Sequence, residues 1–427
     1  MSSIVEKIYF DYAATTPIDP EVKKAMELYL EDKFGNPSST HSLGQEARVA
    51  VDKARETVAD FLGCNFIEVY FTSGATEANN LAIKGVINKF QVSSFSEAVP
   101  PLAGRYGAGK FQVHIITNEI EHKSVLKPVE SLEKSGLVEA IYLPVDKNGA
   151  VDINNLKNKI KENTALISAM YVNNETGVIQ PIGEIGKIIK EWKTENRSKL
   201  GIQYPLFHID AVQAAGYLPL NIRDLGCDLL SLSAHKIGGP KGIGVLFVKD
   251  GTPIAPLIEG GGQEFGLRSG TENVVGIVGL GKAVEIIRHP SFNFQFPIFN
   301  KITNPKSQIQ NITSLRDYFE ENLLKNIKNT SVNGGGAPRA PHISNILFKG
   351  AEAETLLIAL DEAGIMASSG SACQAKAIEP SYVLLATGLS KKETMSSVRF
   401  SFGKFTTQEE IDRVLKILPE MIEKLRK

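Results

Sequence analysis

The chain has little cysteine, a single tryptophan and no long apolar run. Its three cysteines, Cys64, Cys227 and Cys373, are too few and too scattered for a disulfide framework, and they form no CxxC pair for zinc. No apolar run approaches the roughly 18 residues that a membrane-spanning helix needs. The first residues show neither the apolar core of a signal peptide nor the Arg-rich pattern of a transit peptide. We therefore expect a cytoplasmic protein with no membrane partner and no metal.

The chain also lacks an excess of charge of either sign. It carries 47 Lys and Arg against 48 Asp and Glu, a formal net charge of −1. This balance predicts no direct binding of nucleic acid. With 42% hydrophobic and 22% charged residues, the composition is that of a globular protein. Because 427 residues exceed the usual length of one domain, two domains are expected.

Short apolar runs alternate with amphipathic stretches, a pattern typical of an α/β fold with a mainly parallel sheet. Seven strands are expected, at 68–72, 114–117, 139–143, 166–172, 207–209, 229–233 and 244–248. Helices are expected at 76–89, 123–135, 182–192 and 272–287. After about residue 310 the pattern changes to that of a smaller α+β domain. We expect a large domain over 17–264 and a smaller one over 1–16 and 265–427. Two segments are read as insertions: a surface loop at 91–110, and a stretch at 289–312 that either packs on the surface or covers a groove.

Two chemically distinctive residues stand at the ends of neighbouring apolar strands. Lys236 ends the run that begins at Leu229, and Asp210 ends a strand 26 residues earlier. Taken alone, Lys236 is a solvated residue of a Gly-rich turn and Asp210 the cap of a helix. Ligands of open α/β sheets bind at the carboxyl ends of strands. A desolvated Lys beside a carboxylate is the pair that pyridoxal phosphate requires, so the two together favour that cofactor.

Residues 71–80 form a third feature, an apolar strand followed by a tight Gly turn and a helix. This arrangement directs backbone N–H groups at an anion. Neither the Walker pattern nor GxGxxG is present, which disfavours mononucleotides and dinucleotides. A small phosphorylated cofactor fits better.

The sequence resembles the cysteine desulfurases of the NifS/IscS group, which belong to the class-V aminotransferase branch of the fold-type-I pyridoxal phosphate enzymes. The resemblance covers nearly the whole chain. It implies the α/β fold of that class, with a large domain built on a mainly parallel seven-stranded sheet and a smaller α+β domain. The motifs that carry it lie at 9–17, 34–39, 71–80, 121–125, 172–177, 208–213, 233–236, 268–273, 368–373, 379–384 and 397–401.

The resemblance implies a role for each residue that matches a motif. Lys236 would hold pyridoxal 5′-phosphate covalently, Asp210 would pair with the pyridinium nitrogen, and His122 would stack on the ring and move protons. The remaining cofactor contacts would be Ala75, Thr76, Ser233 and His235 at the phosphate, Thr271 from the second subunit of a homodimer, Gln213 at the ring hydroxyl, and Asn174. Asn36, Asn174 and Arg399 would bind the substrate, since a guanidinium suits a carboxylate.

Cys373 lies in a stretch rich in Gly and Ser, which favours a loop over a core position. The resemblance implies that its thiolate takes sulfur from L-cysteine as a persulfide, releases L-alanine, and passes the sulfur to an acceptor protein, either an iron–sulfur scaffold or a tRNA-thiolation relay. The insertions are also similar to those of selenocysteine lyase, which is the alternative function. An incidental surface cysteine is the structural alternative for Cys373.

Overall fold

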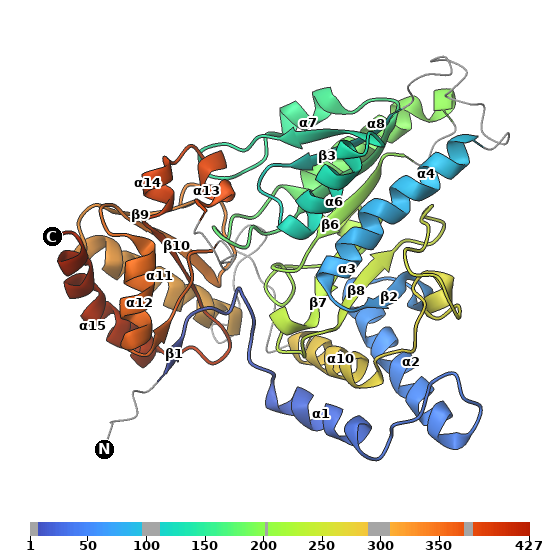
Figure 1. Ribbon diagram of the computed structural model, residues 1–427, viewed down its shortest axis with the longest axis horizontal. Coiled ribbons are helices and arrows are strands. Elements are labelled where there is room, and N and C mark those ends of the chain that lie inside the picture. The colour runs from blue at the N-terminus through green and yellow to red at the C-terminus, as the bar shows by residue number, and fades with distance from the viewer. Residues whose placement is uncertain (1–6, 96–111, 201–203, 289–307, 371–378) are drawn as a thin grey trace.

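The computed structural model describes residues 7–95, 112–200, 204–288, 308–370 and 379–427. Its largest sheet has seven strands in the order β2-β8-β7-β6-β5-β3-β4, with helices on its faces (Figure 1). Strand β8 pairs antiparallel with both β2 and β7, and the other pairings are parallel. All seven expected strands are present, so the predicted α/β fold class is confirmed. Their bounds are β2 Val69–Thr72, β3 Val113–Asn118, β4 Val138–Leu143, β5 Thr164–Met170, β6 Leu206–Asp210, β7 Leu229–Ser233 and β8 Gly244–Val248.

The helices around this sheet differ from expectation in two places. The helix expected at 76–89 consists of α3 (Ala75–Asn80), a π-helical turn (Leu81–Gly85) and α4 (Val86–Phe95). The predicted loop therefore does not begin at residue 91, because the stretch up to Phe95 has no Gly or Pro to end the helix. Helices α6 (Lys123–Lys134), α8 (Ile182–Leu200) and α10 (Val274–Arg288) occupy three further expected segments, and α7 (Ile153–Lys159) and α9 (Ile222–Leu225) are short additions.

Helix α1 (Pro20–Leu30) was not expected from the sequence, and of α2 (Ser42–Leu62) the sequence indicates only the end, at Gly63. Much of the buried face of α2 is alanine, including Ala47, Ala50 and Ala54, so its apolar stripe is weak. Both helices pack on α10. Helices α2 and α10 approach closely at Gly281, where an added Cβ would lie only 2.7 Å from the Cβ of Ala54. The contact therefore requires glycine at this position.

The smaller unit is built on a three-stranded antiparallel sheet in the order β12-β10-β9 (Figure 1). Phenylalanines dominate its core, where Phe319, Phe400 and Phe402 pack edge to face. The elements are β9 Thr330–Val332, β10 Ile343–Phe348, β12 Ser397–Ser401, α11 Gln308–Asn326, α12 Ala353–Glu362, α13 Tyr382–Ala386, α14 Lys391–Thr394 and α15 Gln408–Leu425, with a two-stranded parallel pair, β1 Ile8–Tyr9 and β11 Ile365–Met366.

The hydrophobic cores indicate which residues belong to each of the two units. Ile8 and Phe10 belong to the core of the smaller unit, although the chain then crosses to the large sheet. Helix α10 contributes Ile277, Leu280 and Val284 to the core of the large unit, which favours placing residues 274–288 there rather than after a boundary at 265. The division into 17–264 and 1–16 with 265–427 stays a prediction.

The expected insertion at 289–312 is shorter on its C-terminal side than predicted. Helix α11 begins at Gln308, and Ile309 and Ile312 are buried three residues apart, as a helix face requires. Residues 96–111 and 289–307 lie outside the described residues.

Candidate active site

The carboxyl ends of the central strands bring the predicted residues together. Asp210 is the last residue of β6, and β6 pairs in parallel with both β5 and β7. Ser233 ends β7, and Lys236 closes the helical turn Ala234–Lys236 that follows. These side chains therefore gather at the carboxyl ends of the strands, as the sequence predicts.

The Lys236 amine is enclosed by main-chain oxygens of the N-terminal segment. Its Nζ donates to the carbonyl of Ala13 at 2.6 Å and to that of Ala14 at 2.7 Å. Burial, followed by the positive charge of Arg399, lowers the pKa of Lys236 to about 8, although Asp11 and Asp210 oppose the shift. A lysine with such a pKa has a substantial neutral fraction near pH 7, which is the form that attacks a carbonyl group.

Asp210 is buried, and both of its oxygens are engaged. Its Oδ2 accepts from Nδ2 of Asn79 at 2.8 Å, and its Oδ1 accepts from the N–H of Val212 at 3.1 Å. The second contact lies within the turn that follows β6; the helix that Asp210 would have capped is not formed there, since residues 212–217 are turns. The first comes from α3 across the site, and the sequence analysis did not identify it. The carboxylate is thus fixed in orientation, as a partner of a protonated ring nitrogen must be.

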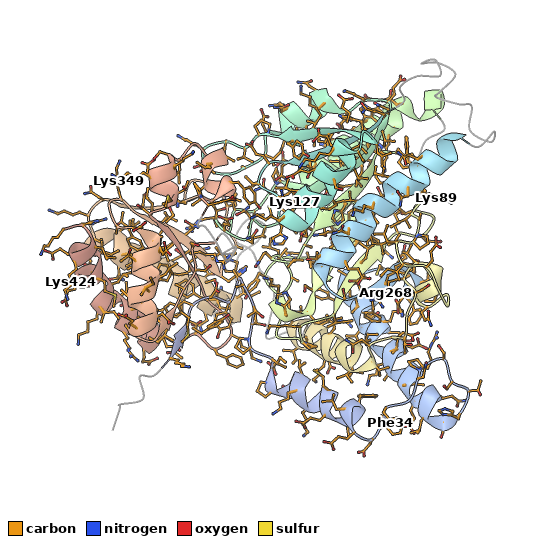
Figure 2. All side chains as sticks on the ribbon, in the orientation of Figure 1. Phe34, Lys89, Lys127, Arg268, Lys349 and Lys424 are labelled. Carbon is orange, nitrogen blue, oxygen red and sulfur yellow. The ribbon has the colours of Figure 1, made fainter. Side chains whose placement is uncertain are left out.

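A chain of hydrogen bonds joins Asp210 to His122. Asn79 also donates to Oγ of Ser124 at 2.8 Å, and that hydroxyl lies 2.8 Å from Nδ1 of His122. Desolvation lowers the pKa of His122, opposed by Asp210. The N–H of Ser124 also donates to Nδ1 at 3.1 Å, so the proton of the neutral ring is on Nε2. The His122 side chain lines a hollow together with Thr76 and Lys127, the last of which is labelled in Figure 2.

Glu121 is a buried carboxyl group that the sequence analysis did not single out. Its Oε1 accepts from Nδ2 of Asn118 and from the N–H of Met170, both at 2.5 Å. Burial, and then the charge of Asp210, raises its pKa well above the usual value. Its Oε2 has no hydrogen-bond partner among the described residues. The raised pKa favours the protonated form of Glu121, because a second negative charge beside that of Asp210 is unfavourable.

The expected phosphate contacts lie on two touching turns. Ala75 and Thr76 begin α3 after Gly74, whose φ of +150° favours glycine. Ser233 pairs with Gly244 in the β7–β8 register, and a Cβ on Gly244 would lie 2.7 Å from the Cα of Gly74. The absence of side chains at both glycines therefore brings the Ser233 strand end against the Gly74 turn.

Two further expected residues, His235 and Gln213, border the same region. Nδ1 of His235 lies 3.2 Å from the Thr15 hydroxyl, and burial lowers its pKa to about 4. Gln213 donates to the carbonyl of Ala13 at 2.8 Å, the oxygen that also accepts from Lys236. Its Oε1 lies 3.2 Å from Nε2 of buried His342, whose pKa is lowered well below normal by burial. Neutral His342 therefore orients the Gln213 amide, a contact that the sequence analysis missed.

The site expected to bind the substrate carboxylate has residues from both sheets: Arg399 lies on β12 of the smaller sheet, and Asn174 lies in the loop after β5 of the larger one. Arg399 of β12 is 3% exposed and donates to Oδ1 of Asp11 at 2.6 Å and to the carbonyl of Asn174 at 2.8 Å. Its Nε and the side-chain Oδ1 of Asn174 are buried without a hydrogen-bond partner among the described residues. Buried polar atoms are normally paired, so these two atoms fit a ligand with a polar group.

Two expected residues, Asn36 and Thr271, are not joined to this group by any contact of the described residues. Asn36 and Thr271 are exposed; Asn36 accepts from the N–H of Ser38 at 2.9 Å, a contact within its own loop. Their roles, including that of Thr271 across a subunit interface, stay predictions. Cys373 lies outside the described residues.

The chain is similar over nearly its whole length to proteins of known family. The family model of the class-V aminotransferases matches residues 8–414. A relative named cysteine desulfurase IscS, from Dictyoglomus turgidum, is 44% identical over 98% of this chain and 95% of its own length. A solved NifS-like protein covers 98% of this chain and 100% of its own, at 34% identity and a TM-score of 0.82. A solved structure of SspA in complex with cysteine covers 94% of this chain and 100% of its own, at 35% identity and a TM-score of 0.73.

The chain belongs to the class-V aminotransferase family. The resemblance predicted from the sequence is therefore confirmed. Enzymes of this family depend on pyridoxal 5′-phosphate, and the residues present fit that group: a lysine with a lowered pKa, a fixed carboxylate at a neighbouring strand end, and an open Gly74 turn at a helix start.

None of the helices in the described part of the chain is long and apolar enough to cross a membrane. Within those same ranges, no group of three or more His, Cys, Asp or Glu side chains is placed to hold a metal ion.

The pKa of Lys236 gives a first prediction. In the cofactor-free protein, pyridoxal and cyanoborohydride should modify Lys236 at a rate that rises with pH and is half-maximal near pH 8, because deprotonation makes the amine nucleophilic. Peptide mapping at several pH values measures this rate, with peptides of surface lysines as the internal reference. A midpoint at or above pH 10 would contradict the enclosed amine described here.

Proposed function

We propose that this protein is a pyridoxal-phosphate-dependent cysteine desulfurase, which converts L-cysteine to L-alanine and retains the sulfur as a persulfide on Cys373. The observation that carries the proposal is Arg399, a buried guanidinium. Its Nε has no hydrogen-bond partner among the described residues, and its positive charge lowers the pKa of Lys236. An arginine so close to the cofactor lysine suits the carboxylate of an α-amino acid. The cysteine-bound neighbour supports cysteine as that amino acid.

The backbone of Arg399 links the substrate site to the segment that carries Cys373. The N–H of Ser368 donates to the carbonyl of Arg399 at 3.1 Å, and the N–H of Arg399 donates to Ser368 at 2.6 Å. Cys373 follows Ser368 by only five residues. This connection supports a reaction between the Cys373 thiol and a substrate whose carboxylate is held by Arg399.

The other two cysteines are poor candidates for the sulfur-accepting thiol. Burial raises the pKa of Cys64 to about 12, helped by Glu68. Cys227 is 4% exposed, as expected of a core residue, and burial raises its pKa as well. A thiolate is required for attack on sulfur. Cys373 is therefore assigned the role.

Bound pyridoxal phosphate supplies an electron sink for the bonds at the substrate Cα. Arg399 and Asn174 hold the substrate carboxylate, with Asn36 assigned to the same task. Lys236 would hold the cofactor and move the proton of the substrate Cα. His122 would lie against the cofactor ring with its protonated Nε2 available as a proton donor. Asp210 supports positive charge at the ring nitrogen.

The Cys373 thiolate then attacks the sulfur of the substrate. An S–S bond forms as the substrate C–S bond breaks, and the electron pair of the broken bond stays with carbon, which takes up a proton. The sum is L-cysteine plus thiol giving L-alanine plus persulfide. The carbon is reduced and the sulfur oxidised, so no external oxidant is needed.

The acceptor and the assembly complete the proposal. The persulfide sulfur passes to an acceptor protein, either an iron–sulfur scaffold or a tRNA-thiolation relay, and the enzyme acts as a homodimer in which Thr271 completes the partner's phosphate site. A thiol that must stay reduced between turnovers suits the cytoplasm. Relatives named as cysteine desulfurases favour this function over selenocysteine lyase.

Replacing Cys373 tests the sulfur half of the chemistry. Cys373→Ser should keep the visible band of the bound cofactor and its change on addition of cysteine, yet lose alanine formation by at least about 100-fold, because a hydroxyl cannot hold a persulfide. A wild-type rate in this variant would contradict the mechanism. Loss with cysteine but not with selenocysteine would identify a dual enzyme, and a wild type active only on selenocysteine would identify the lyase.

Mixed dimers test the shared site. Lys236→Ala and Thr271→Trp should each be inactive as homodimers. After subunit exchange at equal amounts, half of the dimers carry one intact site of two, so about a quarter of wild-type activity should return. Tagged subunits verify the exchange. Complete exchange with no recovered activity would contradict a site completed by Thr271.

A further inference from the structure

Glu175 is a buried carboxyl group for which the mechanism above has no use. It follows Asn174 in the loop after β5 and is 2% exposed. The loop is rigidly held, since the N–H of Glu175 donates to Oδ1 of Asn173 at 2.9 Å and its carbonyl accepts from Nδ2 of Asn345 at 3.1 Å. Burying a carboxyl group is costly, so its contacts call for an explanation.

The carboxyl of Glu175 is bonded to the chain after residues 371–378 and lies close to the chain before them. On the C-terminal side, the hydroxyl of Ser381 donates to Oε2 of Glu175 at 2.5 Å. On the N-terminal side, a Cβ on Gly370 would lie 3.2 Å from the same Oε2. One oxygen therefore lies at both ends of the segment that contains Cys373.

Each end is adapted to this carboxyl. Gly370 has a φ of +84°, so both its backbone conformation and its distance from Glu175 favour glycine. Ser381 is the N-cap of α13, where its Oγ accepts from the N–H of Leu384 at 3.1 Å while its hydroxyl proton goes to Glu175. A single serine thus starts the helix and fastens it to the large unit.

Helix α13 has a second attachment beside His122. The Tyr382 hydroxyl donates to the carbonyl of Glu121 at 2.6 Å, and Val383 packs with Ile120 and Met170. The chain that follows the Cys373 segment, at Ser381 and Tyr382, is therefore fixed to two loops. The loop of Glu121 also carries the cofactor residue His122, and the loop of Glu175 also carries the substrate residue Asn174.

We propose that Glu175 is a positioning residue for sulfur transfer, which fastens Ser381 after the Cys373 segment and borders Gly370 before it, beside the loop that carries Asn174. The inference rests on the proposed function. Holding a nucleophile near its target converts an encounter into an intramolecular step, and a misplacement of about 1 Å can cost on the order of 100-fold. Glu175 acts on the distance between two reacting groups. It does not alter the reactivity of the thiol or the binding of cysteine.

The test uses four variants of the full-length holoenzyme. Glu175→Ala removes the carboxyl, and Ser381→Ala removes its hydrogen-bond donor while leaving Glu175 in place. Glu175→Gln keeps the side-chain length and an acceptor oxygen. Ser390→Ala is the matched control, because Ser390 caps the neighbouring α14 through the N–H of Glu393 at 3.3 Å and makes no hydrogen bond to Glu175.

Three quantities are measured for each variant. Single-turnover mixing with L-cysteine, quenched and analysed by mass spectrometry, gives the rate of persulfide formation on Cys373. The cysteine-induced change of the cofactor band gives substrate affinity. The rate of alkylation by iodoacetamide in the absence of cysteine gives the intrinsic reactivity of the thiol.

Glu175→Ala and Ser381→Ala should slow persulfide formation about 10- to 100-fold, with cysteine affinity and alkylation rate within about twofold of wild type. Glu175→Gln should restore the rate to within about threefold of wild type, since its amide oxygen accepts from Ser381. Ser390→Ala should match wild type in all three measurements.

Transfer at the wild-type rate in both Glu175→Ala and Ser381→Ala would overturn the inference. A slowing matched by an equal loss of alkylation rate, or shared by Ser390→Ala, would assign Glu175 a general structural role and overturn it as well. If the wild type itself forms no persulfide on Cys373, the proposed function fails, which distinguishes that outcome from failure of the positioning role.

Discussion

Residues 11–16 form one short segment on which both halves of the site depend. The carbonyl of Ala13 accepts from the Lys236 amine and from Gln213, and Asp11 pairs with the Arg399 guanidinium. The N–H of Thr16 donates to the carbonyl of His235, while the N–H of Ala13 donates to Ser401 of the smaller sheet. The segment therefore sets the separation between the lysine that holds the cofactor and the arginine assigned to the substrate.

This arrangement also accounts for the electrostatics. Arg399 and burial together depress the pKa of Lys236, whereas Asp11 and Asp210 keep the depression moderate, at about 8. Nearby, burial and the charge of Asp210 raise the pKa of Glu121, and desolvation lowers the pKa of His122, so both shifts favour the neutral forms. The site thus contains a nucleophilic amine, one fixed carboxylate and a neutral imidazole, which is the set that cofactor-based proton transfer at an amino acid requires.

The sequence predicts the sheet well and the polar contacts poorly. Strands such as Leu229–Ser233 are short apolar runs that end in Gly or polar residues, so local pattern is enough to locate them. Asn79 and Asp210 are 131 residues apart, and only the folded sheet brings them together. The same holds for Glu175 and Ser381 and for His342 and Gln213. The extent of helix α2 was not predicted, because alanines form much of its buried face and its apolar pattern is weak.

The central claim is that one thiol, that of Cys373, takes the sulfur of L-cysteine. It is tested most directly by a single turnover with sulfur-labelled cysteine, followed by peptide mapping under non-reducing conditions. The account predicts one labelled sulfur on the Cys373 peptide for each alanine formed, with the Cys64 and Cys227 peptides unlabelled. Label on Cys64 or Cys227, or alanine released with free labelled sulfide and an unlabelled Cys373, would contradict it.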